Sequence, residues 1–218
     1  MVDTHVATGS TNTTDGSLQK VTIPSTSQTE KSGSQWILQY QGSRSTSDLE
    51  RHFGGNVDSF IGALSAAGAS VIIAATLRPS ERAYLMHYSW KIAHGVDPTS
   101  IPEKEGVDID WAHRDSSGKP DIVAAKSAAQ AMVGGYGLGG LNIAPALTSR
   151  HIEGNAIDML ITWDGTLSIV DVANKTVTIT SSPRSGMNPD LATIGKGYGV
   201  VKFVGGDSDK PHWSNDGH

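Results

Sequence analysis

Two short stretches near the C-terminal end of the chain gather side chains that could bind a metal ion. In SRHIEGNAID, His151 precedes Asp158 by seven positions, and in DKPHWSNDGH, Asp209 precedes His212 by three. The 218 residues include no cysteine, so thiolate sites are excluded and any metal site must use His, Asp and Glu. These four residues therefore predict a site built from imidazole and carboxylate ligands.

His151 and Asp158 can share one ion only if the chain turns back between them. Along a straight strand, seven residues would span roughly 23 Å, whereas ligand atoms lie about 2.0–2.2 Å from a zinc ion. Gly154 and Asn155 permit the turn because both residue types tolerate positive φ. Asp158 then lies on a strand between apolar neighbours, where a carboxylate is costly to bury unless a partner such as a metal neutralises it.

His212 supplies the third ligand of the predicted site. Lys210 and Pro211 separate it from Asp209, and proline favours an extended or turned backbone, so His212 can reach the ion while Asp209 stands near a bound water. Two histidines and one carboxylate leave a fourth position for water, which is typical of a catalytic rather than a structural zinc. The ion would activate that water and the nearby carboxylate would accept its proton.

The two stretches together resemble a family signature. The pattern Ser-x-His-x-x-Gly-x-Ala-x-Asp over 149–158, followed by Asp-x-x-His at 209–212, is similar to that of zinc-dependent D-Ala-D-Ala carboxypeptidases and related peptidoglycan peptidases. The resemblance implies a Hedgehog/DD-peptidase-like fold and a general base at Asp209. It also implies three zinc ligands, His151, Asp158 and His212.

The same resemblance assigns contacts to the substrate. The family places an arginine at the end of a strand, just before a helix, where it contacts the substrate and the developing oxyanion. Arg78 occupies that position in IIAATLRPSERAYL. Ser149 is expected as a minor contact with the substrate or with the ligands, and Trp213 either stacks on the substrate or caps the core.

The activity that the resemblance implies is hydrolysis of a peptide bond in the peptidoglycan stem peptide by metal-bound water. The carboxypeptidase branch usually carries glutamate as its base, so Asp209 favours an L-Ala-D-Glu endopeptidase over a D-Ala-D-Ala carboxypeptidase. Two other functions stay open. A non-haem iron oxygenase also uses two histidines and a carboxylate, although usually as His-x-Asp in a double-sheet barrel. A non-catalytic wall-binding or virion-associated module could keep the zinc site without turnover.

The elements that must position these residues are predicted from hydrophobic periodicity and from turn residues. An apolar, β-branched run at 70–77 predicts a buried strand that ends just before Arg78. The order of elements, helices first and then strands joined by short turns, predicts an α+β fold with helices packed on a small, mostly antiparallel sheet. The predicted helices cover 56–68, 80–95, 121–133 and 188–196, and the predicted strands 70–77, 106–111, 156–163, 166–170, 176–180 and 198–203.

Composition limits the domain organisation and the partners. Residues 1–35 are rich in Ser and Thr and predict a flexible leader, and 36–218 predict a single zinc peptidase domain. A net charge of −5 without a Lys/Arg run argues against nucleic acid, and no run of apolar residues is long enough to span a membrane. The expected partner is the stem peptide, and the protein is expected to be a monomer.

Localisation follows from the substrate class and from the first residues of the chain. The substrate lies in the cell wall, in the periplasm or outside the cell, yet the sequence MVDTHVATGS has neither the basic nor the apolar part of a secretory signal. We therefore expect synthesis in the cytoplasm followed by release through lysis or a non-standard export route.

Overall fold

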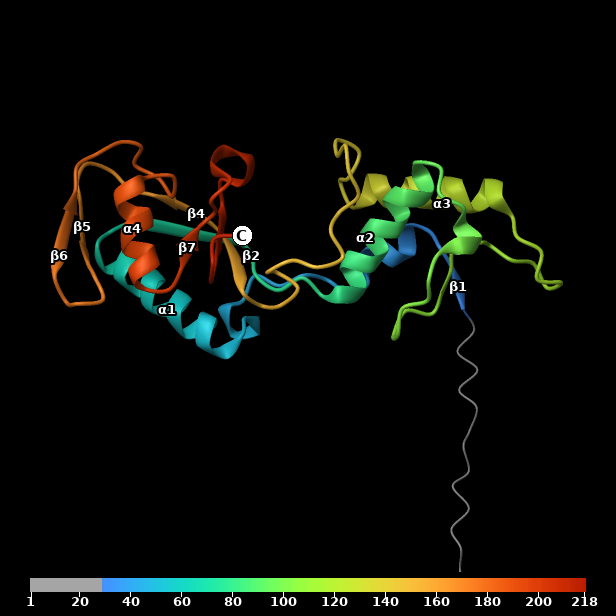
Figure 1. The fold of residues 1–218 in the computed structure, drawn as a ribbon, viewed down its shortest axis with the longest axis horizontal. Helices are drawn as coiled ribbons and strands as arrows, with labels where there is room; N and C mark the ends of the chain where they lie inside the picture. Colours follow the sequence, from blue (N-terminus) through green and yellow to red (C-terminus); the bar gives the residue numbers. More distant parts are fainter. Residues whose placement is uncertain (1–28) are drawn as a thin grey trace, which may run out of the picture.

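The computed structural model describes residues 29–218, which form two lobes joined by a narrow waist (Figure 1). The expected leader, residues 1–35, lies largely outside the described residues. The chain passes through the waist three times, between residues 38 and 51, between 75 and 80, and between 135 and 156. Each lobe has its own cluster of buried apolar side chains.

The first lobe contains a four-stranded antiparallel sheet in the order β2-β4-β8-β7. Helices α1 and α4 supply apolar side chains to the same buried cluster as this sheet, together with a separate hairpin formed by β5 and β6. The bounds are α1 Arg51–Ala66, β2 Ser70–Ala75, β4 Ala156–Thr162, β5 Leu167–Val170, β6 Thr176–Ile179, α4 Pro189–Gly197, β7 Val201–Lys202 and β8 His212–Ser214.

Helix α1 follows directly from its sequence. The Glu50 carboxylate accepts hydrogen bonds from the first free backbone N–H groups of the helix, and Gly68, with φ 84°, follows its last turn. Between these ends, apolar side chains recur every three or four residues and are fully buried, which confirms the expected amphipathic helix. They are Phe53, Val57, Phe60 and Leu64.

Successive side chains of strand β4 point alternately into the core and towards the opposite face of the sheet, where the candidate site lies. Ile157, Met159 and Ile161 point into the buried cluster of the first lobe, whereas Asp158 and Leu160 lie on the opposite face. The cluster therefore fixes the register of β4, because a slip of one residue would bury the carboxylate and expose the isoleucines.

Strand β2 differs from the expected buried strand. It lies at the edge of the sheet, and Ile72 is 60% exposed beside its cross-strand partner Leu160. The β-branched run suggested burial on both faces, but only one face of the sheet is covered by helices. The uncovered face is the one that carries Asp158.

The second lobe packs α2, Ser80–Ala93, against α3, Ile122–Gly135. The 3₁₀ helix η1, Ser34–Leu38, contributes Trp36 to their apolar cluster, and further cluster residues include Tyr84, Trp111 and Met132. The expected strand at 106–111 shortens to β3, Ile109–Asp110, which pairs in parallel with β1, Glu30–Lys31. Ordered pairing therefore begins at Glu30, inside the range expected for the leader.

The mixture of helices with an antiparallel sheet confirms the α+β prediction. Within residues 29–218, none of the helices combines the length and the apolar character that crossing a bilayer requires.

Candidate metal centre

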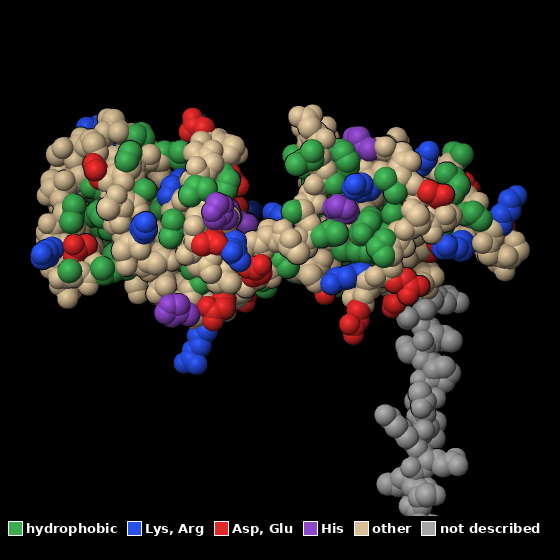
Figure 2. Space-filling model, viewed as in Figure 1, with side chains coloured by type: hydrophobic (Ala, Val, Ile, Leu, Met, Phe, Trp, Pro, Cys, Tyr) green, Lys and Arg blue, Asp and Glu red, His purple; other side chains and the backbone are tan. Residues whose placement is uncertain are grey.

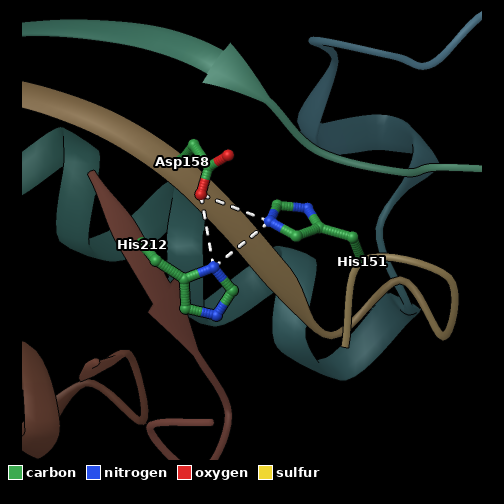
Figure 3. Close-up of side chains that lie close together, drawn as sticks. All are labelled: His151, Asp158 and His212. Atoms are coloured by element: carbon green, nitrogen blue, oxygen red, sulfur yellow. Dashed lines mark hydrogen bonds and ion pairs between the residues drawn. The ribbon is translucent and has the colours of Figure 1, made fainter. Parts of the chain in front are cut away.

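Three side chains from three separate segments meet on the uncovered face of the sheet (Figure 3). His151 comes from the turn before β4, Asp158 from β4 and His212 from β8. His151 Nε2 lies 3.2 Å from Asp158 Oδ1 and 3.3 Å from His212 Nδ1, and the third side of the triangle, His212 Nδ1 to Asp158 Oδ1, is 3.3 Å. The structure thus brings together the three residues expected as metal ligands.

The turn that carries His151 is the one that the glycine predicted. Ser149 closes it through its carbonyl, which accepts hydrogen bonds from the N–H groups of Ile152 and Glu153 at 2.9 and 3.2 Å. Gly154 adopts φ 71°, and a Cβ at this position would lie 2.8 Å from the backbone nitrogen of Glu50. Only glycine fits here, for two reasons. A Cβ would clash with backbone atoms, and a positive φ is unfavourable for residues that carry a side chain.

The segment that follows β2 holds both the ring and the backbone of His151. Its Nδ1 lies 2.6 Å from the carbonyl oxygen of Thr76, so this nitrogen carries the proton and Nε2 presents its lone pair to the centre of the triangle. The Arg78 N–H donates to the His151 carbonyl at 3.0 Å. Hydrogen bonds of this kind fix the tautomer and the ring orientation of metal-ligating histidines.

His212 is held in the complementary way. Strand pairing places it directly opposite Asp158, and its Nε2 lies 3.2 Å from the carbonyl oxygen of His218, which leaves Nδ1 facing the carboxylate. The Ser214 hydroxyl accepts the N–H groups of Gly217 and His218 at 2.8 and 3.0 Å, so the carbonyl that orients His212 is itself fixed.

An ion-pair cluster ties this C-terminal turn to the turn of His151. The Arg150 guanidinium donates to the carboxylates of Asp216 and Glu153, and these hydrogen bonds, together with the two negative charges, raise the pKa of Arg150. Asp216 also accepts the His218 N–H at 3.1 Å. Arg150 therefore connects the two segments that carry the histidine ligands.

The electrostatics of the triangle favour an ionised carboxylate. Burial alone would raise the pKa of Asp158, but the neighbouring imidazoles of His151 and His212 outweigh it and hold the pKa well below its usual range. For His212, burial lowers the pKa, and the hydrogen bond with Asp158 more than reverses this, so the pKa is raised. Both histidines are buried, at 5% and 7% exposure. Two imidazoles and one carboxylate in this arrangement could hold a metal ion.

Asp209 lies beside the triangle. It ends the 3₁₀ helix η4, Gly206–Asp209, and its Oδ2 is 3.9 Å from His212 Nδ1. Its side chain is 48% exposed, so the carboxylate stands at the solvent-facing side of the buried ligands. The structure therefore places the residue expected as general base within reach of the site.

Arg78 lies two residues after Thr76, which contacts the His151 ring. It lines a pocket of about 300 Å³ that also includes His151 and Thr76, at the waist between the lobes. Ser149, which was expected as a minor contact, is half-buried, and its hydroxyl has no hydrogen-bond partner among the described residues.

Trp213 does not take part in the site. Alternation along β8 turns it away from His212 and into the core, where it is fully buried against Phe60, with ring centroids 5.6 Å apart. Of the two expected roles, capping the core is the one that the structure supports, and a stacking contact with a substrate is not available to a side chain without exposed surface.

Sequence reasoning missed three groups that support the ligands. The carbonyls of Thr76 and His218 leave no signal in a sequence, because any residue could supply them. Lys202 donates to the His212 carbonyl at 3.0 Å, and burial lowers its pKa to about 8 against the opposing influence of Asp209 and Asp158. A lysine in a short strand before the DKPH stretch gave no reason to expect this contact.

No known protein-family model matches the chain, and no curated protein sequence matches it either.

Proposed function

We propose that the protein is a zinc-dependent peptidase that hydrolyses a peptide bond of the peptidoglycan stem peptide. The observation that carries the proposal is the triangle of His151 Nε2, Asp158 Oδ1 and His212 Nδ1, with an exposed carboxylate at its edge. A Hedgehog/DD-peptidase-like arrangement of the first lobe and action at the cell wall, reached by lysis or a non-standard export route, are parts of the same proposal.

The spacing of the three ligand atoms suits zinc. In a tetrahedral site with ligands about 2.0–2.2 Å from the ion, neighbouring ligand atoms are about 3.3–3.6 Å apart. The three separations here are 3.2, 3.3 and 3.3 Å. His151, Asp158 and His212 would thus form one face of the tetrahedron and leave its fourth corner open, which is the pattern of catalytic sites.

A zinc ion held by these residues would supply Lewis acidity, which activates water and polarises a carbonyl. Asp209 would act as general base: its half-exposed carboxylate can accept a proton at Oδ2 and pass it to the leaving amine. Arg78, whose backbone is tied to His151, would place positive charge near the carbonyl oxygen as negative charge develops there.

The substrate class rests on the resemblance of the two motifs to peptidoglycan peptidases. Aspartate at position 209, in place of the glutamate usual in carboxypeptidases, supports cleavage of the L-Ala-D-Glu bond over the D-Ala-D-Ala bond. The order of the ligands also supports a peptidase over an iron oxygenase, because here the histidines come from a turn and from a separate strand rather than from one His-x-Asp strand.

The test is digestion of purified peptidoglycan by the zinc-loaded protein, followed by mass spectrometry of the fragments. We expect new amine termini at a single type of stem-peptide bond, and the fragment masses identify that bond. Asp209→Ala should bind zinc with the stoichiometry of the parent and lose most of the hydrolysis, because its side chain is not a ligand.

Two outcomes would contradict the proposal. Absence of new amine termini with the zinc-loaded parent would favour a non-catalytic wall-binding module. Full activity of Asp209→Ala would show that the base is assigned to the wrong residue.

A further inference from the structure

Asp209 is expected to act as the base, yet it lies on a short and exposed segment. It ends η4, in the connection between β7 and β8, and its side chain is 48% exposed. Its Oδ2 nonetheless lies 3.9 Å from His212 Nδ1, at the edge of the candidate metal centre. A group that transfers protons must stay within hydrogen-bond reach of the reacting atoms, so the fold must hold this segment against the site.

Backbone hydrogen bonds hold the two residues at the end of the segment. The Pro211 carbonyl accepts the N–H of Met159, in β4, at 2.8 Å, and the His212 carbonyl accepts the N–H of Phe203 at 3.2 Å. Both donors are backbone groups, so these bonds do not depend on which side chains the donor residues carry. They fix the metal ligand His212, but the first of them lies two residues after Asp209.

The side chain of Lys202 binds the carbonyl that is closer to the base. Its Nζ donates to the carbonyl of Lys210, the residue directly after Asp209, and to that of His212 at 3.0 Å. Lys202 lies in β7 directly across from Trp213 of β8, and its Nζ is 5.1 Å from the centre of that ring. The ammonium therefore sits against a buried ring and binds the carbonyls on either side of the proline.

The hydrogen bond to Lys210 acts on a backbone conformation that the following proline disfavours. The residue before a proline usually has an extended backbone, because helical angles bring it into contact with the proline ring. Lys210 instead has φ −62° and ψ −36°. If ψ changed to the extended range, either the bond to Lys202 would break or Asp209 would move. The bond therefore favours the conformation that places Asp209 at the site.

We propose that Lys202 is a positioning residue for the base and holds Asp209 at the metal centre through the Lys210 carbonyl. The inference rests on the proposed function, which gives Asp209 its role in proton transfer. The hydrogen bonds of Lys202 go to backbone carbonyls, so it acts through Asp209 rather than on the reacting atoms. The metal ligands depend on it less, because His212 keeps its backbone hydrogen bond and its pairing with Asp158 when Lys202 is replaced.

The test replaces the lysine by methionine, which has a side chain of similar length and lacks the donor. In Lys202→Met we expect kcat for a soluble stem peptide to fall by about 10- to 100-fold with little change in KM, because a small displacement of a catalytic group has an effect of this size. Zinc affinity, measured by competition with a chelator, should stay within about threefold of that of the parent. Lys196→Met is the matched control, because it removes the same charge from an exposed lysine of α4, and it should match the parent in every measurement.

Two further variants of the same residue sharpen the test. Lys202→Arg should restore part of the lost kcat, because its guanidinium can also donate to both carbonyls. Lys202→Gln, whose side chain is too short to reach both carbonyls, should lose kcat and keep zinc affinity in the same way, and it replaces the methionine variant if that protein does not fold.

Backbone ¹⁵N relaxation of the zinc-loaded full chain follows the segment without any need for activity. In Lys202→Met the order parameters of residues 206–210 should fall from about 0.85, which is typical of rigid backbone, to below about 0.6. Those of β8 should not change, since its pairing with β4 and β7 does not involve the lysine side chain.

Two results would overturn the inference. One is a segment 206–210 that stays rigid in Lys202→Met, and the other is a loss of zinc affinity as large as the loss of kcat, which would make Lys202 a support of the ligands instead. The two proposals fail separately. If the parent cleaves no peptidoglycan while Lys202→Met loosens the segment, the peptidase is refuted and the hold of Lys202 on Asp209 stands. If the parent cleaves and Lys202→Met keeps full kcat, the reverse is true.

Discussion

The two lobes use histidine in different ways. In the second lobe, His87 Nδ1 lies 2.7 Å from the Pro145 carbonyl, and His94 stacks on Trp90 with ring centroids 3.7 Å apart. In the first lobe, His151 and His212 each use one ring nitrogen for a carbonyl as well, but the other nitrogen faces Asp158.

The difference lies in the surroundings of the ring nitrogen that does not contact a backbone carbonyl. Within the part of the chain that the structure describes, the His151, Asp158 and His212 group is the one cluster suited to a metal ion. A carbonyl alone satisfies a histidine, whereas a carbonyl on one side and a shared carboxylate on the other prepare it to bind a cation. Histidine side chains are visible on both lobes (Figure 2), so the residue type is less informative than the partners that the fold provides.

The largest effect should come from removing one ligand. His151→Ala should abolish stoichiometric zinc binding, because only two of the three expected ligands remain. His87→Ala, the matched change in the second lobe, should bind zinc like the parent. Competition with a chelator of known affinity measures both. Loss of zinc in His87→Ala would break the distinction between the lobes.

A smaller effect should follow from breaking the ion pairs that hold the C-terminal turn. Arg150→Ala releases Asp216, and with it the His218 carbonyl that orients His212, so zinc affinity should fall by about 10- to 100-fold. Arg150→Lys should restore part of the loss, and Arg114→Ala, which breaks an ion pair in the second lobe, should leave affinity unchanged. If Arg150→Ala bound zinc as tightly as the parent, the ion pairs of Arg150 would not be needed to orient the histidines.

The smallest effect concerns pH in the second lobe. Burial raises the pKa of Tyr136 to about 12, against the lowering influence of Arg82, and its hydroxyl donates to the Trp36 carbonyl at 3.1 Å. A raised pKa means that the folded state favours the protonated phenol. Its stabilising contribution is complete below about pH 10, the usual pKa of tyrosine, and is lost as the pH rises towards 12.

Urea unfolding at pH 9 and pH 11 checks this expectation. Tyr136→Phe should be somewhat less stable than the parent at pH 9, because it lacks the hydrogen bond, and should lose less stability than the parent at pH 11. Zinc should not change that difference, since Tyr136 lies in the second lobe. An equal loss of stability in both proteins would show that the phenol does not titrate in the fold.

Local signals in the sequence were enough for most elements and for grouping His151, Asp158 and His212 as candidate ligands. The apolar spacing of α1, the alternation of β4 and the turn at Gly154 each depend on neighbours within a few residues, so they could be predicted. The grouping of His151, Asp158 and His212 followed from residue chemistry, from the need for a turn and from the resemblance of the two motifs to a family signature.

Other features depended on contacts between distant residues. The edge position of β2, the short strand β8 and the division of the core into two clusters could not be derived from local pattern. The burial of Trp213 followed only once its strand was paired between β4 and β7.

By itself, then, the sequence determined which atoms are available to a metal and where the chain must bend to bring them together. The tertiary structure alone decided which ring nitrogen of each histidine faces Asp158, because Thr76 lies 75 residues from His151 and its carbonyl reaches the ring only after β2 has paired with β4. The physical reason is that propensity acts over a few residues, whereas the orientation of a ligand depends on hydrogen bonds that folding alone can bring within reach.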